Sequence, residues 1–119
     1  MTASPDIELQ QALYAALTVA VNPTAVEAHP AHDRATPYVN IGETYLTEHP
    51  AGHEILADVH VWSTAEGPHE AKQLQHNIRL ALHEQHSVGA DWRFLPMRET
   101  QARIIRDPDD ETWHGVQTF

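Results

Sequence analysis

The chain has 119 residues, 41% of them apolar, and a net charge of −10 at pH 7. This composition excludes a wholly disordered chain and predicts one compact domain over residues 1–119. The acidic balance argues against binding of nucleic acid or anionic membranes over the general surface, and the lack of cysteine excludes disulfides and thiolate chemistry.

The first predicted element is a helix from Pro5 or Asp6 to Val19. Ser4 precedes it as a candidate N-cap, proline suits the first helical position, and apolar residues recur at a spacing of three to four. Asn22-Pro23 ends the helix. Residues 22–36, rich in Ala, Pro, His and Asp, are predicted to form a loop that has room for a helical turn near Ala25.

Two strands follow, joined by a connection that is longer than a tight hairpin needs. Residues 37–43 favour a strand, residues 44–52 a projecting loop, and residues 53–64 a second strand. In the second strand Ile55, Ala57, Val59 and Val61 alternate with more polar neighbours. The apolar face is therefore expected to meet the core.

A second helix is predicted from Pro68 to about His86, and two further strands at residues 97–106 and 111–119, joined by a turn at Asp107–Asp110. The order is α-β-β-α-β-β. Short links between successive strands indicate antiparallel pairing. We therefore expect an α+β fold, an antiparallel four-stranded sheet with two helices packed on one face.

Ten histidines make a metal site worth testing. His69, His76 and His83 recur every seven residues on the second helix, about 10.5 Å apart, which is too far to share one ion. His83 and His86 are close enough along the helix to bind the same metal ion, and so are His29 and His32 within a loop. None belongs to a recognised ligand motif. We expect no metal and no cofactor, and a solvated polar face is the simpler interpretation.

No catalytic arrangement stands out. The sequence lacks a G-x-S-x-G elbow, a phosphate-binding loop and a dinucleotide fingerprint, and its three serines sit where caps or turns are expected. The paired carboxylates Asp109 and Asp110 lie in a predicted turn and are expected to be solvated. General acid–base catalysis needs burial or a charged partner to tune the pKa, and a solvated turn offers neither. The expectation is a protein that is not an enzyme.

The two loops are the candidate contact surfaces. Tyr45 and Leu46 place an apolar pair on the projecting loop, a pattern typical of interaction sites. Glu48 and His49 belong to the same candidate surface, and His29 and His32 to the other loop. Trp62, Trp92 and Trp113 are open to two interpretations, packing against the fold or contact with another subunit.

Four segments in order resemble one known family. They are P-Y-V-N-I-G-E at 37–43, H-V-W-S at 60–63, E-A-K-x-L at 70–74 and R-D-P-D-D-x-T-W-H-G-V at 106–116. This set resembles the tail completion, or tail terminator, proteins of long non-contractile phages, prophages and gene transfer agents. The likeness extends from the first helix to Phe119, and the many histidines and the acidic N-terminal half depart from it.

The resemblance implies a structural protein that forms a ring, usually of six subunits, at the head-proximal end of a tail. Such a ring caps the finished tail tube, ends its polymerisation, meets the head connector or stopper, and lets DNA pass without specific binding. The implied location is a virion or phage-like particle, assembled in the host cytoplasm. The alternative is a small histidine-rich metal-binding or metal-dependent protein.

Overall fold

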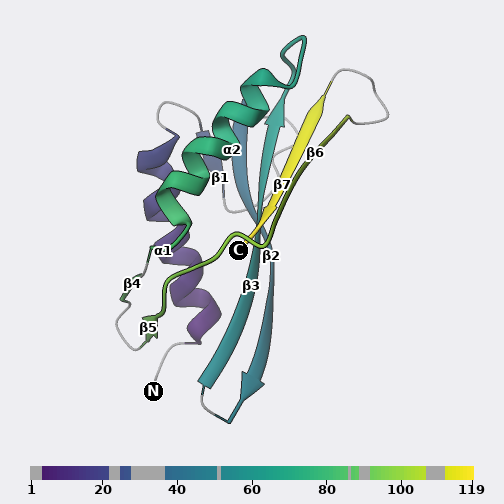
Figure 1. Ribbon diagram of the computed structural model, residues 1–119. Helices are drawn as coiled ribbons and strands as arrows, with labels where there is room; N and C mark the ends of the chain where they lie inside the picture. Colours follow the sequence, from purple (N-terminus) through teal and green to yellow (C-terminus); the bar gives the residue numbers. More distant parts are fainter. Residues whose placement is uncertain are drawn as a thin grey trace.

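The computed structural model describes residues 4–21, 25–27, 37–50, 52–85, 87–88, 92–106 and 112–119. Its elements, in chain order, are α1 (Pro5–Ala20), β1 (Ala25–Glu27), β2 (Tyr38–His49), β3 (Gly52–Ser63), α2 (His69–Leu82), β4 (Ser87–Val88), β5 (Arg93–Phe94), β6 (Gln101–Arg106) and β7 (Trp113–Thr118). Both helices lie on the same side of the sheet (Figure 1). No described helix is long and apolar enough to cross a membrane.

The main sheet has the strand order β1-β2-β3-β7-β6. The four strands predicted from the sequence, β2, β3, β7 and β6, are antiparallel neighbours, which confirms the α+β class and the four-stranded antiparallel sheet. The structure adds β1, which pairs in parallel with Tyr38–Asn40 at one edge, and a separate two-stranded sheet of β4 and β5.

The helices bury the stripes that their periodicity predicts. On α1 the fully covered positions are Leu9, Leu13 and Leu17, and on α2 they include Ala71, Ile78 and Leu82. The α1 stripe packs against β1 and β2, and the α2 stripe against β3 and β7. The core residues of β3, Ala57, Val59 and Val61, are at most 1% exposed. The helices thus cover one face of the sheet, which we call the helix face.

Buried polar side chains tie α2 to β7 and β6. The Gln117 side-chain amide donates to the Gln75 carbonyl at 2.9 Å and to Glu99 Oε2 at 2.7 Å, and Gln75 Nε2 donates to the Arg103 carbonyl at 3.1 Å. Arg79 completes the set through a 2.7 Å ion pair with Glu99. These hydrogen bonds offset much of the cost of burying the polar groups and fix how α2 sits on the sheet, although Gln117 Oε1 is buried with no hydrogen-bond partner among the described residues.

Several predicted boundaries were wrong. Residues 25–27 form a strand rather than a helical turn. The helix α2 ends at Leu82 instead of His86, because His83 is extended and Glu84 has φ 62°. Residues 97–100 precede β6 rather than belong to it, because the Met97 amide donates to the Gln85 carbonyl and the Glu99 amide to His83 Nδ1, both just beyond the end of α2.

Candidate interaction surfaces

The predicted loop at residues 44–52 is a continuation of two strands. Thr44–His49 extend β2 and pair with Gly52–Ala57 of β3, so that the hairpin becomes a two-stranded projection. We call residues 44–49 and 52–56 the arm. It extends beyond the rest of the sheet (Figure 1), and the protein measures 46 × 23 × 22 Å. The prediction of a projecting segment fits this geometry, but that of a loop was wrong.

Tyr45 and Leu46 are 55% and 41% exposed, as an interaction site requires. They point to opposite faces, because side chains alternate along a strand. Tyr45 pairs with Leu56 on the face away from the helices, and Leu46 pairs with Ile55 on the helix face. The two residues are therefore not one patch, and each marks a different side of the arm.

Glu48 and His49 lie at the end of the arm, in cross-strand contact with β3. The carboxylate of Glu48 is 3.5 Å from His53 Nε2, and His49 Nε2 is 3.9 Å from Glu54. All four side chains are solvent-accessible, so these contacts contribute little to stability. His29 and His32 lie outside the described residues.

The face of the sheet away from the helices, which we call the open face, carries a cluster of aromatic and histidine side chains. The Trp62 ring stacks on His114 with centroids 3.8 Å apart, and Trp62 Nε1 donates to Asn40 Oδ1 at 2.7 Å. His60 Nδ1 lies 2.7 Å from His114 Nε2. Trp62 thus packs on its own sheet, in line with the first of its two interpretations.

Glu43, Asp58 and His60 are the one group of described residues whose ligand atoms could hold a metal ion, all lying within 4.8 Å of one another. Ligand atoms around a tetrahedral zinc ion lie about 3.3 Å apart, so the side chains would have to close in. Asp58 already accepts a hydrogen bond from Thr118 at 2.7 Å. Spacing along the sequence does not reveal this group, because its members meet through a bulge in β2 and the pairing of β2 with β3.

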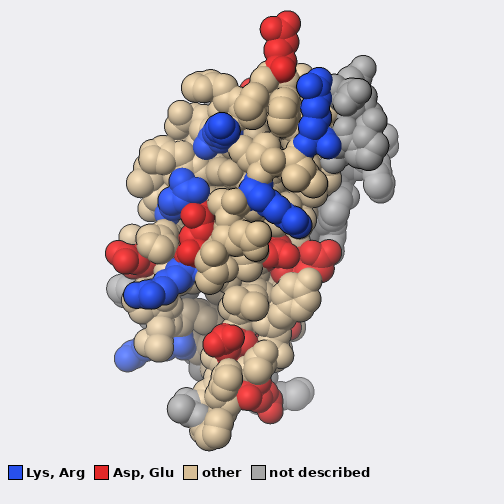
Figure 2. Space-filling view, turned by 45° about the vertical axis from the view of Figure 1, so that its right-hand side comes forward, with Lys and Arg blue, Asp and Glu red and all other residues tan. Residues whose placement is uncertain are grey.

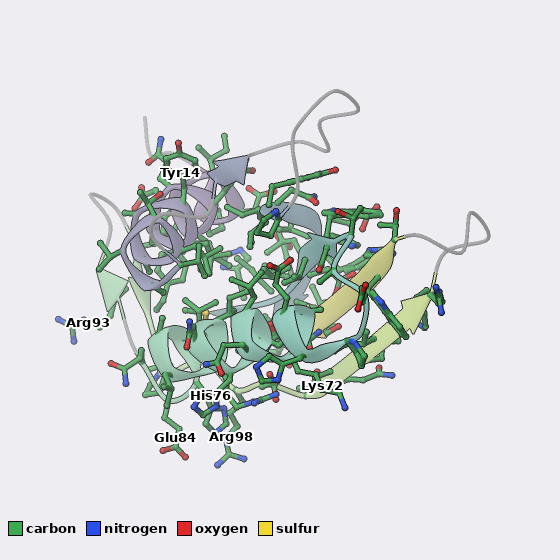
Figure 3. All side chains as sticks on the ribbon, turned by 90° about the horizontal axis from the view of Figure 1, so that it is seen from above. Tyr14, Lys72, His76, Glu84, Arg93 and Arg98 are labelled. Carbon is green, nitrogen blue, oxygen red and sulfur yellow. The ribbon has the colours of Figure 1, made fainter. Side chains whose placement is uncertain are left out.

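The histidines of α2 point mostly to solvent, as predicted. His69 and His76 are exposed, and His76 and Lys72 lie on the outer side of the helix (Figure 3). His83 is half-buried and its Nδ1 accepts a hydrogen bond from the Glu99 amide at 3.0 Å. The suggested pair of His83 and His86 cannot be assessed, since His86 lies outside the described residues.

Serine chemistry finds no support in the described part of the chain. Ser63 Oγ is buried and donates to Glu70 Oε1 at 2.6 Å, while it accepts from the Ala65 amide at 3.2 Å. The Ser4 hydroxyl contacts Asp6 at the start of α1. Both hydroxyl groups serve local structure, and neither contacts a histidine that could act as a base.

Charge is distributed unevenly over the described surface. All the described lysines and arginines fall between Lys72 and Arg106, on α2, β5, β6 and the segment that joins them. Figure 2 shows them gathered over one part of the molecule, with acidic side chains on the projection below. The arm itself carries no lysine or arginine, and its acids are Glu48 and Glu54.

An open cleft of about 660 Å³ runs between the β3 side of the arm and residues 92–98. Its apolar lining includes Ile55, Trp92 and Met97. Trp92 is held there by an edge contact with His53, with centroids 5.0 Å apart, and by its amide, which donates to Glu8 at 3.3 Å. The β3 edge of the arm therefore faces a segment of its own chain.

The family model for tail completion protein gp17 matches residues 8–119. The chain belongs to this family. No curated protein matches the sequence. A chain in a solved structure of the virion of a native gene transfer agent particle has the same fold, with a TM-score of 0.81 and 20% identity, covering 99% of this chain and 96% of that one.

Family membership confirms the resemblance seen in the sequence and makes the protein a structural component of a phage tail. The surfaces described above are therefore candidates for contacts in assembly. The arm, the open face and the basic side around α2 and β6 are the candidates.

Proposed function

We propose that this protein forms a ring, of six subunits, that caps the finished tail tube at its head-proximal end and joins it to the head connector. The observation that carries the proposal is the match to the tail completion family over residues 8–119. The likeness to a chain of a gene transfer agent virion supports a place in a phage-like particle, assembled in the host cytoplasm.

The surface chemistry is compatible with this role. Exposed apolar side chains on the arm offer contact area that a monomer leaves in water. The net charge of −10 keeps phosphate from sticking to the ring as DNA passes through it. The work of the protein in this proposal is binding, not catalysis.

The test is capping of tail tubes. Tubes assembled from the tube protein of the same particle are mixed with the purified protein, and electron microscopy records the tube ends and lengths. We expect a ring on one end of each tube and an end to its growth. Tubes that keep growing with bare ends at saturating protein would contradict the proposal.

One observation favours a metal-binding role as the second candidate, the Glu43, Asp58 and His60 group on the open face. Binding of a stoichiometric zinc ion by the wild type, lost in His60→Ala, would support it. Isothermal titration calorimetry distinguishes the two functions, because capping requires no ion.

A further inference from the structure

We propose that copies of this chain join edge to edge, the outer edge of β6 in one copy pairing with the outer edge of the β2 arm in the next, so that the sheet continues around the ring. The inference rests on the proposed ring and names the surfaces that build it. It starts from the two ends of the main sheet.

Both ends leave backbone groups unpaired among the described residues. The strand β6 pairs with β7 on one side, and no described strand lies on its other side. At the opposite end, β1 covers only Tyr38–Asn40 of β2, so that Thr44–His49 have no described partner on their outer edge. Unpaired edges of this length favour pairing with another chain.

The other edge of the arm is a poorer candidate. Residues 53–56 of β3 line the cleft opposite the segment 92–98, and His53 contacts Trp92 there, so this edge is already partly covered. The outer edge of β2 is the one that remains. Joining β6 to β2 connects opposite ends of the sheet, which gives a head-to-tail contact of the kind that closes into rings.

The two edges are complementary in charge. Within β6 the charged residues are Arg103 and Arg106, and within β2 they are Glu43 and Glu48. A positive edge thus meets a negative one, whereas β6 against β6 or arm against arm brings like charges together. This pattern selects the head-to-tail arrangement over a symmetric dimer.

The apolar residues fix the register. Exposed side chains occupy both edges, Ile105 at 45% on β6, and Tyr45 and Leu46 on the arm. An antiparallel pairing of Ile105 with Tyr45 also sets Ile104 beside Leu46. Each pair then shares a face, because Tyr45 and Ile105 lie on the open face and their neighbours on the helix face.

The same register sets Arg103 beside Thr47, which pairs with Glu54 on the open face. The Arg103 guanidinium can reach over the short threonine to this carboxylate. One contact thus combines backbone hydrogen bonds, two apolar pairs and a charge pair. This combination is what β-strand addition uses for affinity and for specificity.

Disulfide cross-linking tests the register directly, because the chain has no cysteine of its own. The variant Thr47→Cys/Arg103→Cys places the two thiols about 14 Å or more apart in one chain, since three strand spacings separate β2 from β6. Only a second copy can bring them within disulfide range. Pairs of Arg103→Cys with Tyr45→Cys or His49→Cys test registers shifted by two.

We expect oxidation of Thr47→Cys/Arg103→Cys, alone and with tail tubes, to give a ladder of covalent multimers that ends at the ring. The control Thr47→Cys/Gln11→Cys, with its second thiol on an exposed position of α1, should give at least tenfold less. If the wild type forms rings but none of the three cysteine pairs gives more covalent multimer than this control, the proposed edge pairing is wrong, while the proposed ring is not contradicted. If the wild type forms no ring under any of these conditions, the proposed function fails as well.

Charge exchange gives an independent measurement. Gln101→Glu/Arg103→Glu makes both edges acidic, and Thr47→Lys/Glu48→Lys makes both basic. Each alone should lose about tenfold in association while it keeps the monomer's melting temperature. An equimolar mixture should restore association, because the two variants can alternate around one ring with an acidic edge against a basic edge at every contact. Association of either variant at the wild-type level would overturn the proposal.

Discussion

Individual residues of the sheet can be constrained by the helix that covers them. Gly115 lies in β7 on the helix face, and a Cβ added there would be 2.6 Å from Gln75 Nε2 and 3.2 Å from its Cδ. Gln75 has little freedom to move, because its side chain donates to the Arg103 carbonyl and its own carbonyl accepts from Gln117. The glycine is therefore required by space rather than by backbone angle.

We expect Gly115→Ala to lower the free energy of unfolding by about 1–3 kcal/mol, because the added methyl group forces Gln75 out of its network. Urea denaturation measures the change. Gly67→Ala is the matched control, since a Cβ at that position meets nothing within 4 Å, and its effect should stay within about 0.5 kcal/mol. Equal stabilities for the two variants would show that Gln75 and its hydrogen bonds rearrange at no measurable cost.

A second prediction at this scale concerns metal. Glu43 is 69% exposed at its side chain, and His60 already contacts His114, so the fold does not depend on an ion at Glu43, Asp58 and His60. A chelator should leave the melting temperature of the folded protein unchanged. A large drop on chelation, with an ion that survives dialysis, would instead favour the metal-binding role.

At the scale of elements, most of the arm lies outside the core, and Ile55 is its one residue that packs against the core cluster. Its strands are exposed along nearly their whole length beyond the bulge after Ile41, whereas Val39, Ile41, Val59 and Val61 are buried. Changes on the arm should thus act on assembly and leave the monomer's stability alone.

Tyr45→Ser and Leu46→Ser should each leave the melting temperature of the monomer nearly unchanged and weaken ring formation or tube capping, and the double variant should weaken it further. Burial of one large side chain contributes roughly 1.5–3 kcal/mol, which repeats around a ring. Mass measurement in solution and microscopy of tube ends are the readouts.

Val19→Ser is the control for the arm, because Val19 is 81% exposed on α1, which is not among the candidate contact surfaces. It should cap tubes as the wild type does. If a double variant of Tyr45 and Leu46 unfolds, the arm belongs to the core. If it folds and caps normally, the contact lies elsewhere.

The elements that the sequence predicts well are those whose burial follows a local period. Two such patterns can be recognised in the sequence alone, the alternation at Ala57, Val59 and Val61 and the apolar stripes of the two helices. The arm has no such period, because both of its faces meet solvent, and β1 is too short to show one. The Glu43, Asp58 and His60 group depends on a bulge and on strand register, which spacing along the chain cannot reveal.

At the scale of the whole molecule, the net charge sets the electrostatic repulsion between copies. Ten histidines against a net charge of −10 mean that full protonation of the histidines would bring the formal charge to zero. Four of the described histidines also lie within 3.9 Å of a glutamate, among them His53 beside Glu48. Protonation of the histidines on acidification thus reduces the net negative charge of the surface as a whole.

We expect self-repulsion to fall and light scattering to rise as the pH is lowered from about 7 to 5, the range in which histidine side chains gain protons. Added salt should reduce the difference between the two pH values, because it screens repulsion at both. Scattering that stays flat across this range would contradict the prediction.

The position of β7 has a consequence for how the protein is made. This last described strand along the sequence lies between β3 and β6, and β6 joins the sheet only through it. A nascent chain still on the ribosome can form the β2–β3 hairpin and both helices, but β6 has no place until residues 113–118 have emerged. If the proposed edge pairing holds, unfinished or clipped chains lack the β6 edge that would recruit the next copy, and assembly excludes them without any separate inspection step.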